Sequence, residues 1–339
     1  MEQRLLPPQS TVAQNDYIQE MVLLSRKQVL PTIIVDSDLL IRFINEPARL
    51  LFDGYYDLAY KPFFNVFGRI FTRVEIKNFF YCIRSEEKGY SWFGNIMHRA
   101  RLLKTLNTKV RVHPIFDPSD VLVGYWVLFE DVTDQSIEAY KQMLGGILQA
   151  SKLKDNETGL HAERLNFYCR NFTEYLLSLN SYPQITRDFI ENISFLAAIH
   201  DVGKIGTPDY ILQKQSRLSS IEWEIMKEHT INGALIVSSF PIPMAKEITL
   251  SHHERWDGKG YPFNLQGEMI PLSARIVSIA DVYDALRMKR PYKKALSHEK
   301  TVQIITRGAG KQFDPDLVRH FQKIHTKFDI VWEMLNTYA

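Results

Sequence analysis

The pattern of apolar residues changes near residue 133, and this change constrains the fold more than any other feature of the chain. Residues 31–133 hold short β-branched and aromatic runs bounded by polar turns, which predict strands: TIIVDSDLLIRFIN, TKVRVHPIF and LVGYWVLFEDVTD. The later segments carry apolar residues at helical spacing. A chain of 339 residues also exceeds the usual size of one compact domain. We therefore expect an α+β protein with a strand-rich first domain and an all-α second domain.

The strand-rich segment resembles a PAS sensor domain in the order of its expected elements. A first strand leads into a polar turn at residues 36–38, and a second strand ends at Asn45 before the helical stretch EPARLLF. A late antiparallel pair then closes on the sequence DVT at residues 131–133. The resemblance implies a PAS-like antiparallel sheet domain over residues 31–133, preceded by a helical extension over residues 1–30.

PAS domains bind varied small molecules or none, so the ligand of this domain is left unknown. Either His98 or His113 is a candidate haem ligand, although a lone histidine in a strand-rich domain is more often structural. A group of aromatic residues in the same segment would line a pocket or, more often, fill a core: Phe63, Phe64, Phe67, Phe71, Phe79, Phe80 and Tyr81.

Residues 134–155 are expected to form a linking, signal-carrying helix between the two domains. Apolar residues recur there at alternating three- and four-residue spacing: Ile137, Tyr140, Leu144, Ile147 and Ser151. This stripe predicts a parallel coiled coil and hence a homodimer, and the alternative is a helix that packs on its own domain. The pair Gly145-Gly146 weakens such a helix by roughly 1–2 kcal/mol relative to alanines.

The helical part of the chain is rich in side chains that bind metals. The stretch HHERWDGKGYP, residues 252–262, follows a His200-Asp201 pair by about 50 residues. Imidazole and carboxylate donors fall in five short segments: Glu157, His161, His200, Asp201, His229, His252, His253 and Asp281. These donors suit first-row ions such as iron, manganese or zinc, whereas calcium and magnesium favour oxygen ligands alone. One four-coordinate ion needs only about four donors, so the surplus predicts two or three ions bridged by a carboxylate such as Asp201.

Spacing along a helix predicts how some of these donors share an ion. Glu157 and His161 are four residues apart, which places both on one helical face. The neighbours His252 and His253 would diverge by about 100° on a helix. We therefore expect that these two histidines bind different ions or lie where a helix ends.

From about residue 150 to the C-terminus the chain resembles the HD-GYP domain, a helical subgroup of the HD phosphohydrolase superfamily. The motifs that carry the resemblance occur in the family's order: ETGLHAERL, LAAIHDVGKIGTPDYIL, HHERWDGKGYPFNLQGEMIPLSARIVSIADVYDAL, KRPYKKAL and GAGKQFDPDLV. The resemblance implies an HD-GYP phosphodiesterase domain over residues 150–339, formed as a helical bundle. It also implies hydrolysis of the bacterial second messenger cyclic di-GMP to pGpG and, in many members, onward to GMP.

The resemblance implies roles for matched positions as well. The metal ligands would be His200, Asp201, His229, His252, His253 and Asp281, with Glu157 and His161 completing a site for a third ion. Asp201 would bridge the ions, and Lys204 would face the scissile phosphate as a second catalytic residue. Substrate would be bound by Tyr261, Arg290 and Lys293. Iron is the first expectation for the metal and manganese the second, and a GGDEF or other signalling protein is a further expected partner.

Two competing functions remain open from the sequence. One is an effector that binds a cyclic dinucleotide without appreciable turnover, and the other is an HD phosphohydrolase with a different cyclic dinucleotide or a nucleoside phosphate as substrate. The chain departs from the family pattern at Gln215-Ser216, at Thr230 and at Arg287. We expect Arg287 to add positive charge near the substrate pocket.

Composition excludes several other classes of function. The formal charge of +2 and the lack of long basic runs argue against polymeric DNA or RNA as a partner. Cys82 and Cys169 form no CxxC pair, which fits a reducing cytoplasm. The longest apolar run, VLVGYWVLF, is far shorter than the ~20 residues of a spanning helix. We expect a cytoplasmic protein without membrane insertion.

Overall fold

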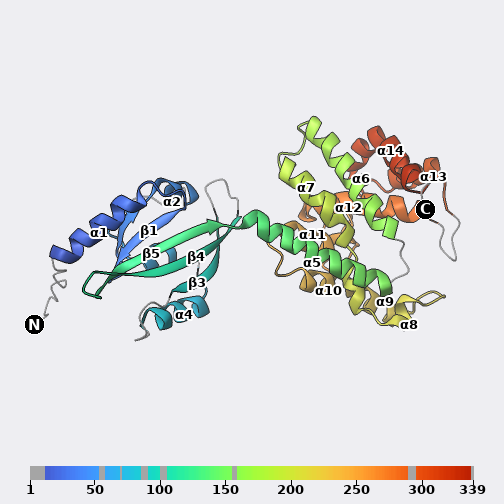
Figure 1. Ribbon diagram of the computed structural model, residues 1–339. Coiled ribbons are helices and arrows are strands. Elements are labelled where there is room, and N and C mark those ends of the chain that lie inside the picture. The colour runs from blue at the N-terminus through green and yellow to red at the C-terminus, as the bar shows by residue number, and fades with distance from the viewer. Residues whose placement is uncertain are drawn as a thin grey trace, which may run out of the picture. The chain divides into compact units, whose positions relative to one another are not determined.

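The structure is a computed structural model, and it describes residues 12–52, 58–68, 71–84, 91–99, 105–154, 159–288 and 295–336. The chain divides into two compact units, Met1–Ala139 and Tyr140–Ala339 (Figure 1). Each unit has a hydrophobic core of its own. The α+β class is confirmed, because strands occupy the first unit and helices the second.

The first unit is built on a five-stranded antiparallel sheet in the order β2-β1-β5-β4-β3. Its strands are β1 (Thr32–Asp36), β2 (Ile41–Ile44), β3 (Trp92–Arg99), β4 (Thr105–Phe116) and β5 (Leu122–Asp131). The helices described beside the sheet are α1 (Val12–Ser25), α2 (Glu46–Leu51), α3 (Phe63–Phe67) and α4 (Arg73–Arg84). The predicted PAS-like sheet domain is confirmed by this arrangement.

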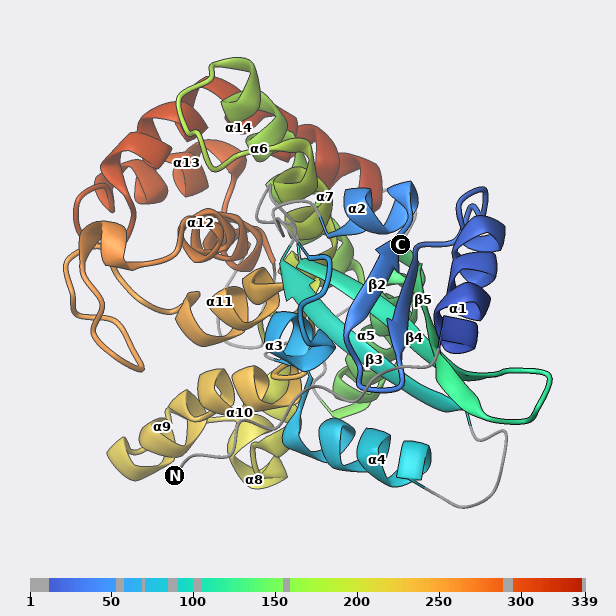
Figure 2. The ribbon, with the colours of Figure 1, turned by 90° about the vertical axis from the view of Figure 1, so that its left-hand side faces the viewer.

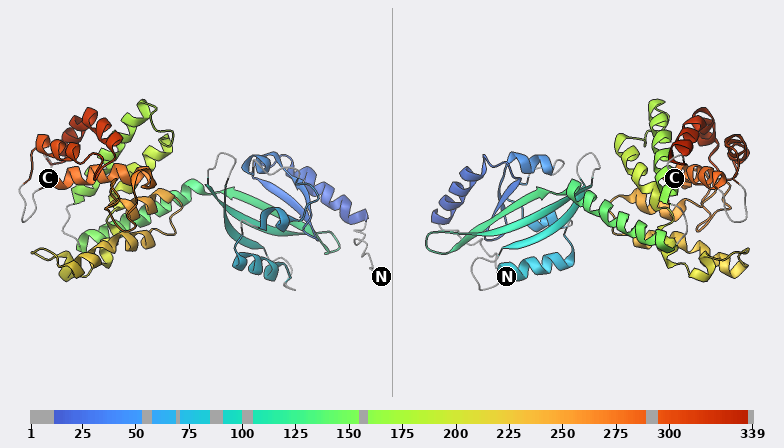
Figure 3. Two further views of the ribbon diagram at one scale, coloured as in Figure 1. Left: turned by 180° about the vertical axis from the view of Figure 1, so that it is seen from behind. Right: turned by 45° about the vertical axis from the view of Figure 1, so that its right-hand side comes forward.

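The two faces of the sheet are covered by different helices, because successive strand residues point to opposite sides. Ile33 and Val35 of β1 face a core that includes Phe79 of α4. Ile34 lies between them in the sequence and packs in a second cluster with Ile18 of α1. Helices α1 and α4 therefore lie on opposite faces of the sheet (Figure 3).

The aromatic residues of the first unit mostly form its core. Phe63, Phe67 and Phe79 are buried, whereas Tyr81 is 79% exposed. His98 lies in this core against the ring of Phe52, and its Nε2 atom is 3.1 Å from Thr108 Oγ1. His113 Nδ1 is 2.6 Å from Ser91 Oγ. These contacts favour packing over a pocket for the aromatic group and a structural role for both histidines.

Helix α5 (Thr133–Lys154) begins directly after β5, where the DVT sequence supplies its first hydrogen bonds. Asp131 Oδ1 accepts a hydrogen bond from the main-chain N–H of Thr133 at 2.9 Å. The hydroxyl of Thr133 accepts another from the N–H of Asn107, also at 2.9 Å. The start of α5 is therefore tied to β4 as well as to β5.

The apolar stripe of α5 packs within the chain itself. Leu144 is completely buried in the core of the second unit, and Tyr140 and Ile147 pack against the same core. The ring of Tyr140 lies 5.5 Å from that of Phe240. These three residues pack on their own domain, which favours the alternative interpretation over a coiled-coil seam. A homodimer stays a prediction.

The second unit contains helices and no strand among residues 159–288 and 295–336. They are α6 (Gly159–Ser178), α7 (Arg187–Leu196), η2 (Ala197–Ile199), η3 (Val202–Gly206), α8 (Asp209–Leu212), α9 (Ser220–Lys227), α10 (His229–Ile236), α11 (Pro243–Ser251), η4 (Gly267–Met269), α12 (Leu272–Arg287), α13 (His298–Arg307) and α14 (Pro315–Asn336). Within the described part of the chain, no helix has the length and hydropathy needed to cross a membrane.

Helix α12 is the central element of the second unit. It contacts α6, α11, α13 and α14, which surround it in Figure 2. The aromatic rings of Tyr168, Tyr283 and Phe328 pack together where α6, α12 and α14 meet, and Tyr168 stacks on Phe328 at 4.6 Å. These rings hold together the helices from which His161 and Asp281 project.

Candidate metal centre

The structure brings seven of the eight predicted donors into two adjoining groups. One group contains Asp201, His229, His252 and His253, and the other contains His161, His200 and Asp281. Within each group the ligand atoms lie within 4.8 Å of one another. Glu157, Arg290 and Lys293 lie outside the described residues.

Most of these donors lie at the ends of short helices. His200 is the C-cap of η2 and Asp201 is the N-cap of η3, while His229 is the first residue of α10. The close packing of η3 on α10 depends on Gly203, because a Cβ atom there would lie 1.9 Å from the main-chain oxygen of His229. Glycine at this position therefore lets α10 bring His229 to the Asp201 carboxylate.

His252 and His253 follow the last residue of α11. Their ring centroids lie 4.1 Å apart, and both belong to the group that contains Asp201. Of the two outcomes expected for this pair, the structure shows the end of a helix. His252 is the C-cap of α11 and keeps helical backbone angles, with its N–H still bonded to the main-chain oxygen of Ile248.

The orientation of three of the imidazoles leaves their Nε2 atoms available to bind a cation. The Nδ1 atoms of His200, His229 and His252 lie 2.7–3.0 Å from the main-chain oxygens of Ala197, Met226 and Ile248. A carbonyl oxygen only accepts, so each Nδ1 must carry the proton that it donates. In the neutral ring Nε2 then bears a lone pair, which is the form that binds a metal.

The Nε2 atoms converge on the carboxylate of Asp201. His200 Nε2 lies 3.1 Å from Oδ2, whereas His229 and His252 Nε2 lie 3.2 and 3.5 Å from Oδ1. The Nε2 atoms of His229 and His252 are themselves 3.5 Å apart. Acceptors at these distances repel one another unless a proton or a cation lies among them. The donor set therefore fits divalent metal ions, with Asp201 within reach of both groups.

The second group contains His200 itself, together with His161 and Asp281. Asp281 Oδ1 is 3.7 Å from His161 Nε2 and 3.8 Å from His200 Nε2. These separations exceed a hydrogen bond but suit three atoms that share one ion as ligands.

The electrostatics of the cluster keep the donors in their metal-binding forms. Burial opposes ionisation of Asp201, but Lys204 and His200 outweigh it and hold the pKa of this carboxyl well below its usual range. Burial lowers the pKa of His252 and of His253. The carboxylate is therefore charged and these two imidazoles are neutral near pH 7.

The imidazole ring of His161 is oriented by Asp284, which lies one helical turn after Asp281 on α12. Its Oδ2 atom lies 2.7 Å from His161 Nδ1, and it also pairs with the guanidinium of Arg164 at 2.6 and 2.8 Å. Tyr168 donates a hydrogen bond to the same carboxylate at 3.1 Å. Asp284 lies three residues after Asp281, on the same side of α12, and these partners lie more than 100 residues away in the sequence.

The Gly-Tyr-Pro turn places Tyr261 beside the metal-binding histidines. The Tyr261 ring lies 4.8 Å from that of His253, and burial raises the pKa of its phenol, so the hydroxyl stays a donor. Glu254 fixes the turn by accepting hydrogen bonds from the main chain of Phe263 and Leu265 at 2.7 and 3.0 Å. Gly260 is required because a Cβ atom there would lie 2.4 Å from the main-chain nitrogen of Arg255.

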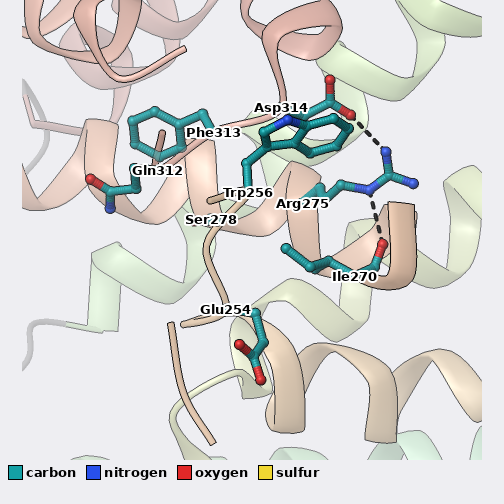
Figure 4. A pocket seen from close by; sticks show the side chains of 8 residues that line it. All are labelled: Glu254, Trp256, Ile270, Arg275, Ser278, Gln312, Phe313 and Asp314. Carbon is teal, nitrogen blue, oxygen red and sulfur yellow. Dashed lines mark hydrogen bonds and ion pairs between the residues drawn. The ribbon is translucent and has the colours of Figure 1, made fainter. Parts of the chain in front are cut away.

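A small pocket lies behind this turn, with a volume of about 10 Å³. Figure 4 shows the indole of Trp256 beside the guanidinium of Arg275, which bonds to Asp314 and to the main-chain oxygen of Ile270. The volume suits about one water molecule. The pocket is therefore too small for a nucleotide, and beside it Arg275 of α12 contacts the ring of Trp256 from the turn.

The charge that Arg287 was expected to add near the substrate pocket is paired within the protein. The side chain is only 7% exposed and pairs with Asp329 at 2.5 Å and with Glu333 at 3.2 Å. Its guanidinium also lies 5.1 Å from the ring of Trp332. Arg287 therefore attaches α12 to α14, and its charge is neutralised within the protein.

Comparisons with known proteins agree with the site. The HD domain family matches residues 159–317. A cyclic di-GMP phosphodiesterase of Vibrio cholerae serotype O1 is 46% identical over 52% of this chain and 37% of its own. A cyclic di-GMP phosphodiesterase of Thermotoga maritima is 36% identical over 60% of this chain and 56% of its own.

A third relative, the 3′3′-cGAMP-specific phosphodiesterase 2 of Vibrio cholerae serotype O1, is 40% identical over 53% of this chain and 34% of its own. The matched region thus spans between about a third and just over half the length of these three relatives. The family match covers all seven residues of the two donor groups. Residues 159–317, which make up most of the second unit, therefore match the HD domain family, and they follow a PAS-like sheet domain.

Proposed function

We propose that this protein hydrolyses cyclic di-GMP to pGpG or GMP by means of divalent ions bound in the metal centre. The observation that carries the proposal is the convergence of imidazole Nε2 atoms on Asp201, with Lys204 Nζ 2.8 Å from the same carboxylate. The names of the relatives support the choice of substrate.

The ligands in this proposal are the donors that the sequence predicted. Asp201 would be shared between the ions, with His229, His252 and His253 on one side. His161, His200 and Asp281 would hold the other ion, and Glu157 would complete a site for a third. Iron is the metal we expect first and manganese second, because mixed nitrogen and oxygen donors suit both.

The metal centre and the charged residues around it would together activate the phosphate of the substrate. Ions bound there supply Lewis-acid polarisation of the phosphate and a nucleophile at neutral pH. Lys204 reaches Asp201 from within η3, so its ammonium group is also close enough to offset negative charge that develops on the phosphate. The buried histidines stay neutral and keep their lone pairs directed at the centre.

Tyr261 would position the substrate from the rim of the site, where its protonated hydroxyl donates to a phosphate oxygen. Arg290 and Lys293 would supply further donors to phosphate, in keeping with their side-chain chemistry.

We infer that the PAS-like unit regulates hydrolysis through α5. That helix begins with hydrogen bonds to Asp131 and Asn107, and further along it contributes Leu144 to the core of the second unit. A signal that changes the start of α5 would thus reach the catalytic unit through one continuous helix. Homodimerisation, a signalling partner such as a GGDEF protein, and a cytoplasmic location are parts of the same proposal.

A second candidate substrate is another cyclic dinucleotide. The specific observation that favours it is the 40% identity to a relative named for 3′3′-cGAMP. Both substrates present phosphodiesters to the same metal centre, so the purine contacts would decide between them.

The proposal is tested with protein purified without oxygen and analysed for bound metals. Cyclic di-GMP and 3′3′-cGAMP are each incubated with it, and the products are separated by chromatography. We expect pGpG or GMP to form, to stop forming after chelation, and to return when iron or manganese is restored. Tight dinucleotide binding without product, in protein that contains its full metal complement, would instead establish an effector.

A further inference from the structure

Trp223 is a large aromatic residue on the surface of the catalytic unit. It lies on α9, and 46% of it is exposed. Helix α9 is held in place at its start, because Ser219 and Glu222 form a reciprocal capping pair and Lys214 binds the Glu222 carboxylate at 2.6 Å. A fixed helix thus presents an indole that the core does not use.

The position of this indole connects it to the metal centre. Its ring lies 6.1 Å from that of Tyr261, at an interplanar angle of 79°. Tyr261 in turn lies 4.8 Å from the ring of His253 and 6.3 Å from that of His229. A single tyrosine therefore separates the metal-binding histidines from an exposed aromatic face.

A positive charge accompanies these rings. The ammonium group of Lys227, one helical turn after Trp223, lies 5.9 Å from the centre of the Tyr261 ring. It also pairs with Glu224 at 2.7 Å, and that carboxylate is 70% exposed. An exposed pair of this kind contributes little to stability, so Lys227 can exchange its partner for a phosphate at small cost.

We propose that Trp223 is a substrate-binding residue that stacks on a purine base of the nucleotide whose phosphate lies at the metal centre. The inference rests on the proposed function and specifies how that site recognises its substrate. Every nucleobase has a π-face, and stacking on an aromatic side chain strengthens binding by roughly 5- to 150-fold per base. Tyr261 would contact the phosphate, and Trp223, the aromatic residue next to it, would stack on the base.

The experiment compares two ligands that differ in the base alone. Binding of GMP and of ribose 5-phosphate to the metal-loaded protein is measured by titration calorimetry, so turnover is not required. The variants are Trp223→Ala, Trp223→Phe and, as a matched control on the same helix, Ile221→Ala. Ile221 is 77% exposed and lies two residues from Trp223, on a different face of α9.

We expect GMP to bind the wild type more tightly than ribose 5-phosphate does. Trp223→Ala should raise the Kd of GMP about tenfold, which corresponds to about 1.4 kcal/mol, and change the Kd of ribose 5-phosphate by less than about twofold. Trp223→Phe should restore most of the difference, and Ile221→Ala should leave both constants within about twofold.

Equal Kd values for the two ligands in the wild type, or equal weakening of both in Trp223→Ala with metal content retained, would overturn the inference. The proposed function is judged separately, by cyclic di-GMP turnover in the wild type. Turnover without a base-specific effect of Trp223→Ala would remove only the stacking role. A base-specific effect without turnover would keep the stacking role and remove the phosphodiesterase.

Discussion

At the scale of single residues, the metal centre depends on which group accepts each Nδ1 proton. Main-chain oxygens accept it from His200, His229 and His252, and a side-chain carboxylate, Asp284, accepts it from His161. A main-chain acceptor cannot be removed by substitution. The side chain of Asp284 can be replaced, so its effect on the orientation of His161 can be measured.

We expect Asp284→Asn to weaken binding of the ion held by His161, His200 and Asp281 by about 10- to 100-fold. The amide still offers an oxygen to His161, but it removes the charge that orients the ring and pairs with Arg164. Chelator competition, monitored for each ion, measures the effect. Tyr168→Phe is the control, because it removes one hydrogen bond to the same carboxylate and leaves the charge in place.

Equal loss of both ions in Asp284→Asn would mean that the substitution disturbs the whole unit. No loss of either ion would mean that His161 is oriented by other contacts. If Asp284 orients His161, Asp284→Asn selectively loses the ion held by His161, and Tyr168→Phe changes its binding by less than about threefold.

Individual donors were predictable from sequence because their chemistry and their motifs identify them without knowledge of the fold. Seven of these donors come together in the structure. The contacts of Asp284 and Trp223 were not predictable in the same way. Arg164 lies 120 residues from Asp284 in the sequence. Trp223 lies on α9, whereas its neighbour Tyr261 lies in the Gly-Tyr-Pro turn. Helical spacing therefore carries no information about either contact.

At the scale of elements, α5 shows how one apolar stripe allows two interpretations. A seam of Tyr140, Leu144 and Ile147 suits a partner helix as well as the helix's own domain, and only tertiary packing distinguishes them. The helix buries this stripe internally. The two glycines that follow Leu144 lie elsewhere on its surface, and a Cβ atom at Gly145 or Gly146 would meet nothing within 4 Å.

Replacing both glycines with alanine should therefore stabilise α5. We expect Gly145→Ala and Gly146→Ala each to raise the free energy of unfolding of the second unit by up to about 1 kcal/mol, through helix propensity. Denaturant unfolding measures the change, and the two effects should be roughly additive. A loss of stability would show that these positions are covered or depart from helical geometry.

The attachment of α12 to α14 gives a prediction for Arg287. Arg287→Met removes the pairing with Asp329 and Glu333 but keeps much of the apolar stem. We expect the free energy of unfolding to fall by about 1–3 kcal/mol, because polar groups packed against the guanidinium lose their partner. The KM for cyclic di-GMP should change by less than about twofold. A severalfold change in KM with unaltered stability would show that Arg287 acts on substrate binding and does not attach α12 to α14.

At the scale of the whole molecule, the fold class followed from the change in apolar pattern near residue 133, and the PAS-like and HD-type units both formed as expected. The strand-like and helical apolar patterns predicted the class of each unit, because each unit buries its apolar residues in a core of its own. Which surface of α5 is buried, and the burial of Arg287, depend on contacts between elements distant in the chain. Those contacts follow from packing, which local patterns do not encode.

The central claim is that Asp201 is shared by both donor groups, and the most direct test measures metal content and cyclic di-GMP turnover together in Asp201→Ala. Asp188→Ala, which removes an exposed carboxylate at the start of α7, is the matched control. We expect Asp201→Ala to bind fewer ions per chain and to lose turnover by on the order of 100-fold or more, while Asp188→Ala retains both. Turnover that survives in Asp201→Ala with a full metal complement would contradict the claim.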